Sequence, residues 1–142
     1  MSLKVELKPG ERLIVGNCLI TNADQRTRLF IDGKAPILRE KDILTPATAD
    51  SPAKRIYLAI QLMYLEDNIE GMRLDYFALV DEFVRAVPSS VHILDEINNE
   101  ILTGSLYKAL KVAKQLIQYE RDLLTNAASG SSGLPAGGQA DR

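Results

Sequence analysis

Up to about residue 40 the chain alternates between apolar and polar positions, which is the two-residue period of strands buried on one side. Turn signals interrupt this alternation at Pro9-Gly10, Gly16-Asn17 and Asp32-Gly33. The pattern predicts five short strands, which we place at residues 3–8, 11–15, 18–21, 26–31 and 35–39. An antiparallel unit of this size, residues 2–40, has too small a core to be stable alone. We therefore expect it to pack against helices, a second subunit, or both.

Beyond residue 44 the apolar positions recur every three to four residues, as they do in helices. Residues 45–52 are a linker that ends in a helix start, with Asp50 or Ser51 as N-cap and Pro52 at the first helical position. The helix that follows, residues 52–66, is apolar nearly all round, which is typical of a helix buried on several sides. The same spacing predicts helices at residues 72–87 and from 90 to about 124, with a break at Thr103-Gly104.

These patterns predict an α+β fold in three parts. Residues 1–44 form a small antiparallel β module, residues 45–126 form a segment of three to four helices, and residues 127–142 form a disordered tail. The tail is rich in Gly, Ser and Ala and has no apolar period, so it lacks the means to build a core.

Charge is spread unevenly over the 142 residues, whose net charge is −2. Residues 1–44 contain eight Lys or Arg against six Asp or Glu, and the remainder contains nine against thirteen. The β module therefore permits an anionic partner, although basic nucleic-acid domains usually show a larger excess. The single Cys18 allows no internal disulfide, and no apolar run is long enough to cross a membrane. We expect a cytoplasmic protein with no membrane contact.

Motifs for catalysis are absent from the sequence. There is no phosphate-binding Gly-Lys-Ser/Thr loop, and His92 is the only histidine, so Cys18 and His92 would be the only pair for a Cys/His dyad. A His-rich metal site is impossible for the same reason. We therefore expect no enzymatic activity, no metal and no cofactor.

The fourth predicted strand offers the clearest candidate for binding. Arg26, Arg28 and Phe30 share one face of it, and cations beside a flat ring are what an RNA surface needs for phosphates and bases. The alternative is that Phe30 packs under a helix while the arginine stems cover the edge of the core, and the pattern alone favours this. Phe30 is the only aromatic residue within residues 1–44, which excludes a stacking platform of several rings there.

Arg39 stands at the junction of the two architectures, at the end of the last predicted strand. Its planar guanidinium could meet a base edge or a phosphate from this position. Glu40 and Asp42 flank Arg39 and Lys41 and would partly cancel their charge.

Several segments resemble the FlbT family over about residues 1–125. They are LKVELKPGER from Leu3, GNC from Gly16, DQRTR from Asp24, APILRE from Ala35 and PAKRIY from Pro52. Members of that family regulate flagellum biogenesis. The resemblance implies a post-transcriptional repressor that associates with the 5′ untranslated region of flagellin mRNA and promotes its decay.

Residues 1–44 are also similar to the carbon-storage regulator family of small RNA-binding dimers. The similarity lies in a Gly-Glu after the first strand, an Ala-Pro, and an Arg-Glu after the fifth. It implies that Arg39 contacts RNA together with basic residues of the first strand. Those positions fall on Leu7 and Lys8, so only one is basic here.

The resulting hypothesis is an RNA-binding repressor, as a homodimer or bound to a partner, that recognises the flagellin mRNA leader. Its candidate contacts are Arg39, Lys8, Lys4, Arg26 and Arg28. The second hypothesis is a protein-binding adaptor or chaperone in flagellin synthesis or export, which would bind a flagellar protein through helix 52–66 without direct RNA contact.

Overall fold

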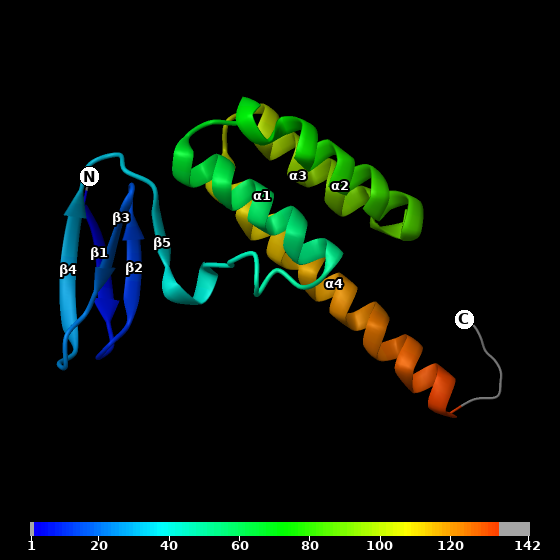
Figure 1. Ribbon diagram of the computed structural model, residues 1–142, viewed down its shortest axis with the longest axis horizontal. Coiled ribbons are helices and arrows are strands. Elements are labelled where there is room, and N and C mark those ends of the chain that lie inside the picture. Colours follow the sequence, from blue (N-terminus) through cyan, green and yellow to red (C-terminus); the bar gives the residue numbers. More distant parts are fainter. Residues whose placement is uncertain (1, 134–142) are drawn as a thin grey trace.

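The computed structural model describes the backbone of residues 2–133 and the side chains of residues 2–127. Five short strands form a β module on one side of the molecule, and α-helices form a bundle on the other (Figure 1). This arrangement confirms the α+β fold class. The strands are β1 (Ser2–Leu7), β2 (Arg12–Val15), β3 (Cys18–Thr21), β4 (Thr27–Asp32) and β5 (Ile37–Arg39). The helices are α1 (Pro52–Glu66), α2 (Arg73–Ala86), α3 (Val91–Leu102) and α4 (Leu106–Gly133), with 3-10 turns η1 (Glu40–Asp42), η2 (Glu70–Met72) and η3 (Pro88–Ser90).

The strands divide into two small antiparallel sheets. β1 pairs with β4, while β2 lies between β3 and β5. The β2–β3 hairpin turns at Gly16-Asn17, where the positive φ of Gly16, 63°, suits the first central position of such a turn. Val5, Leu7 and Leu13 form a small core shared by the two sheets.

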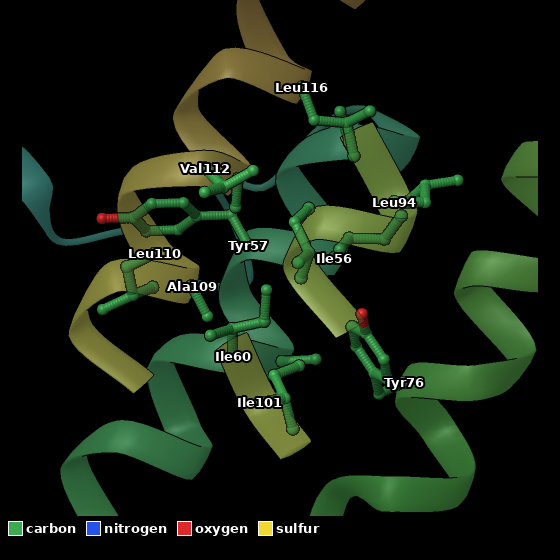
Figure 2. Packing of buried hydrophobic residues seen from close by; sticks show 14 of the residues in the cluster. Ile56, Tyr57, Ile60, Tyr76, Leu94, Ile101, Ala109, Leu110, Val112 and Leu116 are labelled. Atoms are coloured by element: carbon green, nitrogen blue, oxygen red, sulfur yellow. The ribbon is translucent and has the colours of Figure 1, made fainter. Parts of the chain in front are cut away.

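The larger core lies among the helices and is centred on α1. Ile56, Ile60 and Met63 of α1 are completely buried. Figure 2 shows Ile56 and Ile60 packed among side chains of the neighbouring helices, including Leu94 and Leu110. The prediction of a helix covered on several sides is thus confirmed, and α1 is the central helix of the bundle.

Both ends of α1 are fixed by specific groups. Ser51 is the N-cap, and its Oγ accepts a hydrogen bond from the Lys54 amide at 3.3 Å. Glu120 of α4 adds a second cap, because its carboxylate accepts bonds from Ser51 Oγ at 2.6 Å and from the Ala53 amide at 3.0 Å. The helix ends at Asp67, whose left-handed φ of 50° turns the chain away.

Three side chains of α1 attach the end of the β module to the bundle. Tyr57 donates its hydroxyl to Asp42 O at 2.6 Å, and the Gln61 amide exchanges two bonds with the Leu44 backbone at 2.9 Å each. The Tyr64 hydroxyl bonds both to Ile37 N, at 3.0 Å, and to Ile37 O, at 3.1 Å. Positions 57, 61 and 64 follow the spacing of one helix face, so α1 presents them together.

The structure differs from the sequence-based expectation at the C-terminal end. α4 continues to Gly133, past the point at residue 127 where a disordered tail is predicted. A helix that is already formed adds further residues at little cost, and Ala127 and Ala128 favour it. The rest of the predicted tail lies outside the described residues. Within the described part of the chain, no helix is long and apolar enough to cross a membrane.

Candidate nucleic-acid interface

The outer face of the β1–β4 ribbon carries cations around an exposed aromatic ring. The strand register places Lys4 opposite Phe30 and Glu6 opposite Arg28. Because side chains alternate along a strand, these four point away from the core that contains Val5. Phe30 is 64% exposed, so the alternative that it packs beneath a helix is wrong.

Two carboxylates share this ribbon face: Asp32 at the end of β4, and Glu6, which lies among the cations. Glu6 Oε2 is 3.3 Å from Arg28 Nη2, and Glu6 Oε1 is 3.9 Å from Arg26 Nη1. Both arginine side chains are more than half exposed. Exposed ion pairs contribute only about 0–1 kcal/mol. A phosphate group can therefore compete with Glu6 for both guanidinium groups.

Arg39 ends β5 as the sequence predicts, but it does not lie on the ribbon face. Its Nη2 donates to Glu6 O at 3.0 Å, so the side chain reaches from β5 to the backbone of β1. Its Nε is buried and lacks a hydrogen-bond partner among the described residues. Arg39 thus holds β1 beside β5.

The two acids that flank Arg39 and Lys41 are engaged with other cations. Glu40 Oε1 accepts the Arg12 amide at 2.7 Å and lies 3.7 Å from Arg12 Nε. The Asp42 carboxylate pairs with the Lys114 ammonium of α4. In the described part of the chain, the ion pairs of these two carboxylates are thus with Arg12 and Lys114 rather than with their sequence neighbours.

Lys8 is separate from the ribbon face. It follows β1 directly, where its amide donates to Glu11 Oε1 at 2.8 Å. It lines a shallow depression together with Glu11, Glu40 and Lys41. Among the predicted site residues, the structure thus brings Lys4, Arg26 and Arg28 to the ribbon face. Arg39 lies off that face but lines a cavity together with Lys4, while Lys8 lies elsewhere.

Two features near these residues were not predicted from the sequence. Glu6 was not recognised as the carboxylate shared by two arginines, although it alternates with Lys4 in the first strand. Tyr64 and Tyr107, whose ring centroids are 5.8 Å apart, line a cavity of about 440 Å³ with Arg39. The one-dimensional signal for this pair is weak, because the two tyrosines are far apart in the chain and belong to different helices.

The chemistry of the ribbon face is that of a binding surface. Exposed cations attract phosphates, and the Phe30 ring offers a flat surface for an unpaired base. Among the residues that the structure describes, no three His, Cys, Asp or Glu side chains gather as a metal ion would require.

A small β module with a basic and aromatic face, attached to a helical bundle, defines an α+β protein. The chain belongs to the FlbT family: the family model described as "Flagellar protein FlbT" matches residues 3–124.

Curated relatives in several bacteria carry the same family name. The "Probable flagellum biosynthesis repressor protein FlbT 1" of Bradyrhizobium diazoefficiens is 60% identical over 87% of this chain and 85% of its own length. The "Probable flagellum biosynthesis repressor protein FlbT" of Rhodopseudomonas palustris is 50% identical over 88% of this chain and 99% of its own. The "Flagellum biosynthesis repressor protein FlbT" of Caulobacter vibrioides is 36% identical over 99% of both chains. No solved structure matches this chain.

Proposed function

We propose that this protein represses flagellum biosynthesis after transcription, by binding the 5′ untranslated region of flagellin mRNA through the β1–β4 ribbon face and promoting decay of the message. The names of the relatives support the repressor role. The observation that carries RNA binding is the exposed Phe30 ring, set directly across the ribbon from Lys4 and on the same face as Arg28.

The composition of the ribbon face favours single-stranded RNA over a protein partner. Lys4, Arg26 and Arg28 supply three positive charges against the two carboxylates of Glu6 and Asp32, so the face keeps a small positive excess. Single-stranded nucleic acids are bound by this combination of backbone-directed cations and a stacking ring. A duplex offers no free base faces, so Phe30 would have no role on it.

Arg39 supports the same surface from behind. Its bond to Glu6 O fixes the backbone of the strand that carries Lys4 and Glu6. Its Nε is buried, so Arg39 contributes to the surface by positioning β1 rather than by direct contact through that atom.

The test is a gel-shift titration of transcribed flagellin leader RNA over a series of salt concentrations. Phe30→Ala should weaken binding by about 1–3 kcal/mol, the usual contribution of one stacked base. Lys4→Ala should weaken it for all sequences and reduce the slope of log K against log salt by about 1. No binding of the parent protein at low salt would overturn direct RNA recognition.

Arg85→Ala is the matched control for charge. Arg85 lies on α2, its side chain is 78% exposed, and it pairs with Asp81 at 3.1 Å, so the substitution removes an exposed cation outside the ribbon face. It should leave both the affinity and the salt slope unchanged. An equal loss in Arg85→Ala and Lys4→Ala would mean that overall charge attracts the RNA.

A second candidate function is that of an adaptor for a flagellar protein, and it is favoured by exposed apolar side chains on the bundle. Leu74 and Leu102 are each 82% exposed, and Phe77 is 48% exposed. Phe77 and Leu102 line a groove of about 500 Å³. The predicted docking helix 52–66 is α1, whose apolar face is occupied by the bundle, so this groove is the better surface. The adaptor function would be favoured if the protein captures flagellin, if Leu102→Glu abolishes this capture, and if Phe30→Ala leaves it unchanged.

A further inference from the structure

β3 is an apolar strand with no protection on its outer edge. All four of its residues, Cys18 to Thr21, are exposed, including Leu19 at 57% and Ile20 at 37%. It pairs with β2 on one side, and within residues 2–133 no strand pairs with its other side. Soluble proteins usually guard such edges with Lys, Pro, a bulge or a covering element. β3 has neither Lys nor Pro, and three of its four residues are apolar.

The outward-facing backbone groups of β3 can be assigned from the turn that follows it. The Asn22 amide donates to Glu11 O at 2.9 Å, so residue 22 bonds toward β2. Because hydrogen bonding alternates along an antiparallel strand, Ile20 also bonds toward β2, while Leu19 and Thr21 direct their N–H and C=O groups outward.

β4 has a matching open edge. It pairs with β1 in a sheet of two strands, and an isolated pair of strands is only marginally stable. Glu6 O accepts a hydrogen bond from Arg39 Nη2, so the backbone groups of Glu6 point away from β4. Glu6 and Arg28, which lie opposite each other, are therefore a pair without mutual hydrogen bonds. By the same alternation, Arg28 and Phe30 direct their N–H and C=O groups away from β1.

The corner between β3 and β4 prevents the two edges from meeting within one chain. The Asn22 side-chain amide donates to Leu7 O at 3.2 Å, to Lys8 O at 2.8 Å and to Gln25 O at 2.8 Å. These bonds fix the chain where it passes from one sheet to the other. β3 and β4 are consecutive in sequence, yet the corner assigns them to different sheets.

We propose that two copies of this chain associate edge to edge, with β3 of each copy pairing antiparallel with β4 of the other. Both edges belong to the same chain, so a two-fold axis satisfies both at once and the assembly closes. Each resulting sheet has the order β1-β4-β3-β2-β5, with β1 and β4 from one copy and the remaining strands from the other. Neither β3 nor β4 then has an open edge.

The side-chain faces of the two strands agree in this arrangement. Leu19 of one copy lies opposite Phe30 of the second copy, which pairs the most exposed apolar residue of each strand. Ile20 then lies opposite Leu29 of the second copy. Ile20 shares the core-facing side of Leu13, and Leu29 packs against the same small core, so both sheet faces continue across the junction.

The first test is the molar mass of the full chain in solution, by light scattering or sedimentation over a dilution series. The parent should be a dimer, and Leu19→Lys should raise the dimer dissociation constant about tenfold or more, since the new charge occurs twice in the symmetric interface. Leu102→Lys, which places the same charge at an 82% exposed leucine of α3, should leave the dimer unchanged. A parent that stays monomeric would overturn the proposal.

The second test uses Cys18, the single cysteine of the chain, to report the pairing. The register places Cys18 opposite Ile31 of the second copy in a pair without mutual hydrogen bonds, whose Cα separation suits a disulfide. Ile31→Cys should therefore give a disulfide-linked dimer on a non-reducing gel, and adding Cys18→Ser should abolish it. Leu3→Cys, which lies beside Ile31 on the opposite side of β4, should not cross-link. If Leu19→Lys leaves the dimer dissociation constant unchanged and Ile31→Cys forms no disulfide-linked dimer, another surface mediates association and the proposal is overturned.

Discussion

Glu6 is placed to set how strongly the ribbon face attracts an anion. Its two carboxylate oxygens lie 3.3 and 3.9 Å from the guanidinium groups of Arg28 and Arg26. Glu6→Gln removes that competing charge while the side chain keeps its length and polarity. We expect RNA affinity to rise by about two- to fivefold, because an exposed ion pair contributes about 0–1 kcal/mol. The gain should shrink as salt is added, since salt screens exposed charges.

Asp81→Asn is the control for this measurement. It makes the same change of net charge on α2, where Asp81 pairs with Arg85 in an exposed contact. It should not alter RNA affinity. If Glu6→Gln weakens binding instead, the carboxylate contributes to the surface by orienting the two arginines rather than by opposing the RNA.

Individual residues show what one-dimensional patterning can resolve. Alternation placed Arg28 and Phe30 on one strand face but could not say which face meets the core, because Leu29 and Ile31 on the other face are also apolar. The position of Arg39 at a strand end was predicted, and β5 ends there. Its contact with Glu6 O depends on which strand lies beside β5, and sequence spacing does not contain that information.

At the scale of elements, the start of α1 depends on a residue of α4. The Glu120 carboxylate accepts bonds from Ser51 Oγ and the Ala53 amide, two of the groups that a helix N-terminus leaves unsatisfied. Glu120→Ala should therefore lower the free energy of unfolding by about 1–2 kcal/mol. Urea denaturation measures this, with Glu96→Ala, at an exposed site of α3, as the control that should change little. Equal stabilities of the two variants would contradict the capping role.

The helix starts were predictable because their signals are local, whereas the sheet pairing was not. Two adjacent residues, Ser51 and Pro52, predict the start of α1, and the structure confirms Ser51 as the N-cap. Consecutive short strands favour hairpins, yet β3 and β4 belong to different sheets. The cause is the Asn22 amide and its bonds to backbone oxygens up to 15 residues away, which are tertiary contacts.

At the scale of the whole molecule, buried tyrosines connect the parts of the fold. Tyr57 and Tyr76 are each only 2% exposed. Tyr57 joins α1 to η1 through Asp42 O, and Tyr76 joins α2 to α3 through Asn98 Oδ1 at 2.6 Å. Figure 2 shows the Tyr76 ring directed into the cluster beside Ile101. Burial raises the pKa of both phenols well above the ordinary value of 10, and the nearby Asp42 carboxylate raises the pKa of Tyr57 further.

This burial makes the fold sensitive to alkali. Above pH 10 the unfolded chain releases the two phenolic protons, while the folded chain retains them until its higher pKa is reached. The folded state then binds more protons than the unfolded state, so the free energy of unfolding falls as pH rises above 10, by up to about 1.4 kcal/mol per pH unit for each tyrosine. Below pH 10 this stabilisation is fully present.

Thermal unfolding between neutral and alkaline pH should show this decline in stability. Tyr76→Phe should make the decline less steep, because the phenol that must stay protonated is gone. The comparison with the parent isolates the contribution of Tyr76. Identical pH dependence in Tyr76→Phe and the parent would contradict the role assigned to that buried phenol.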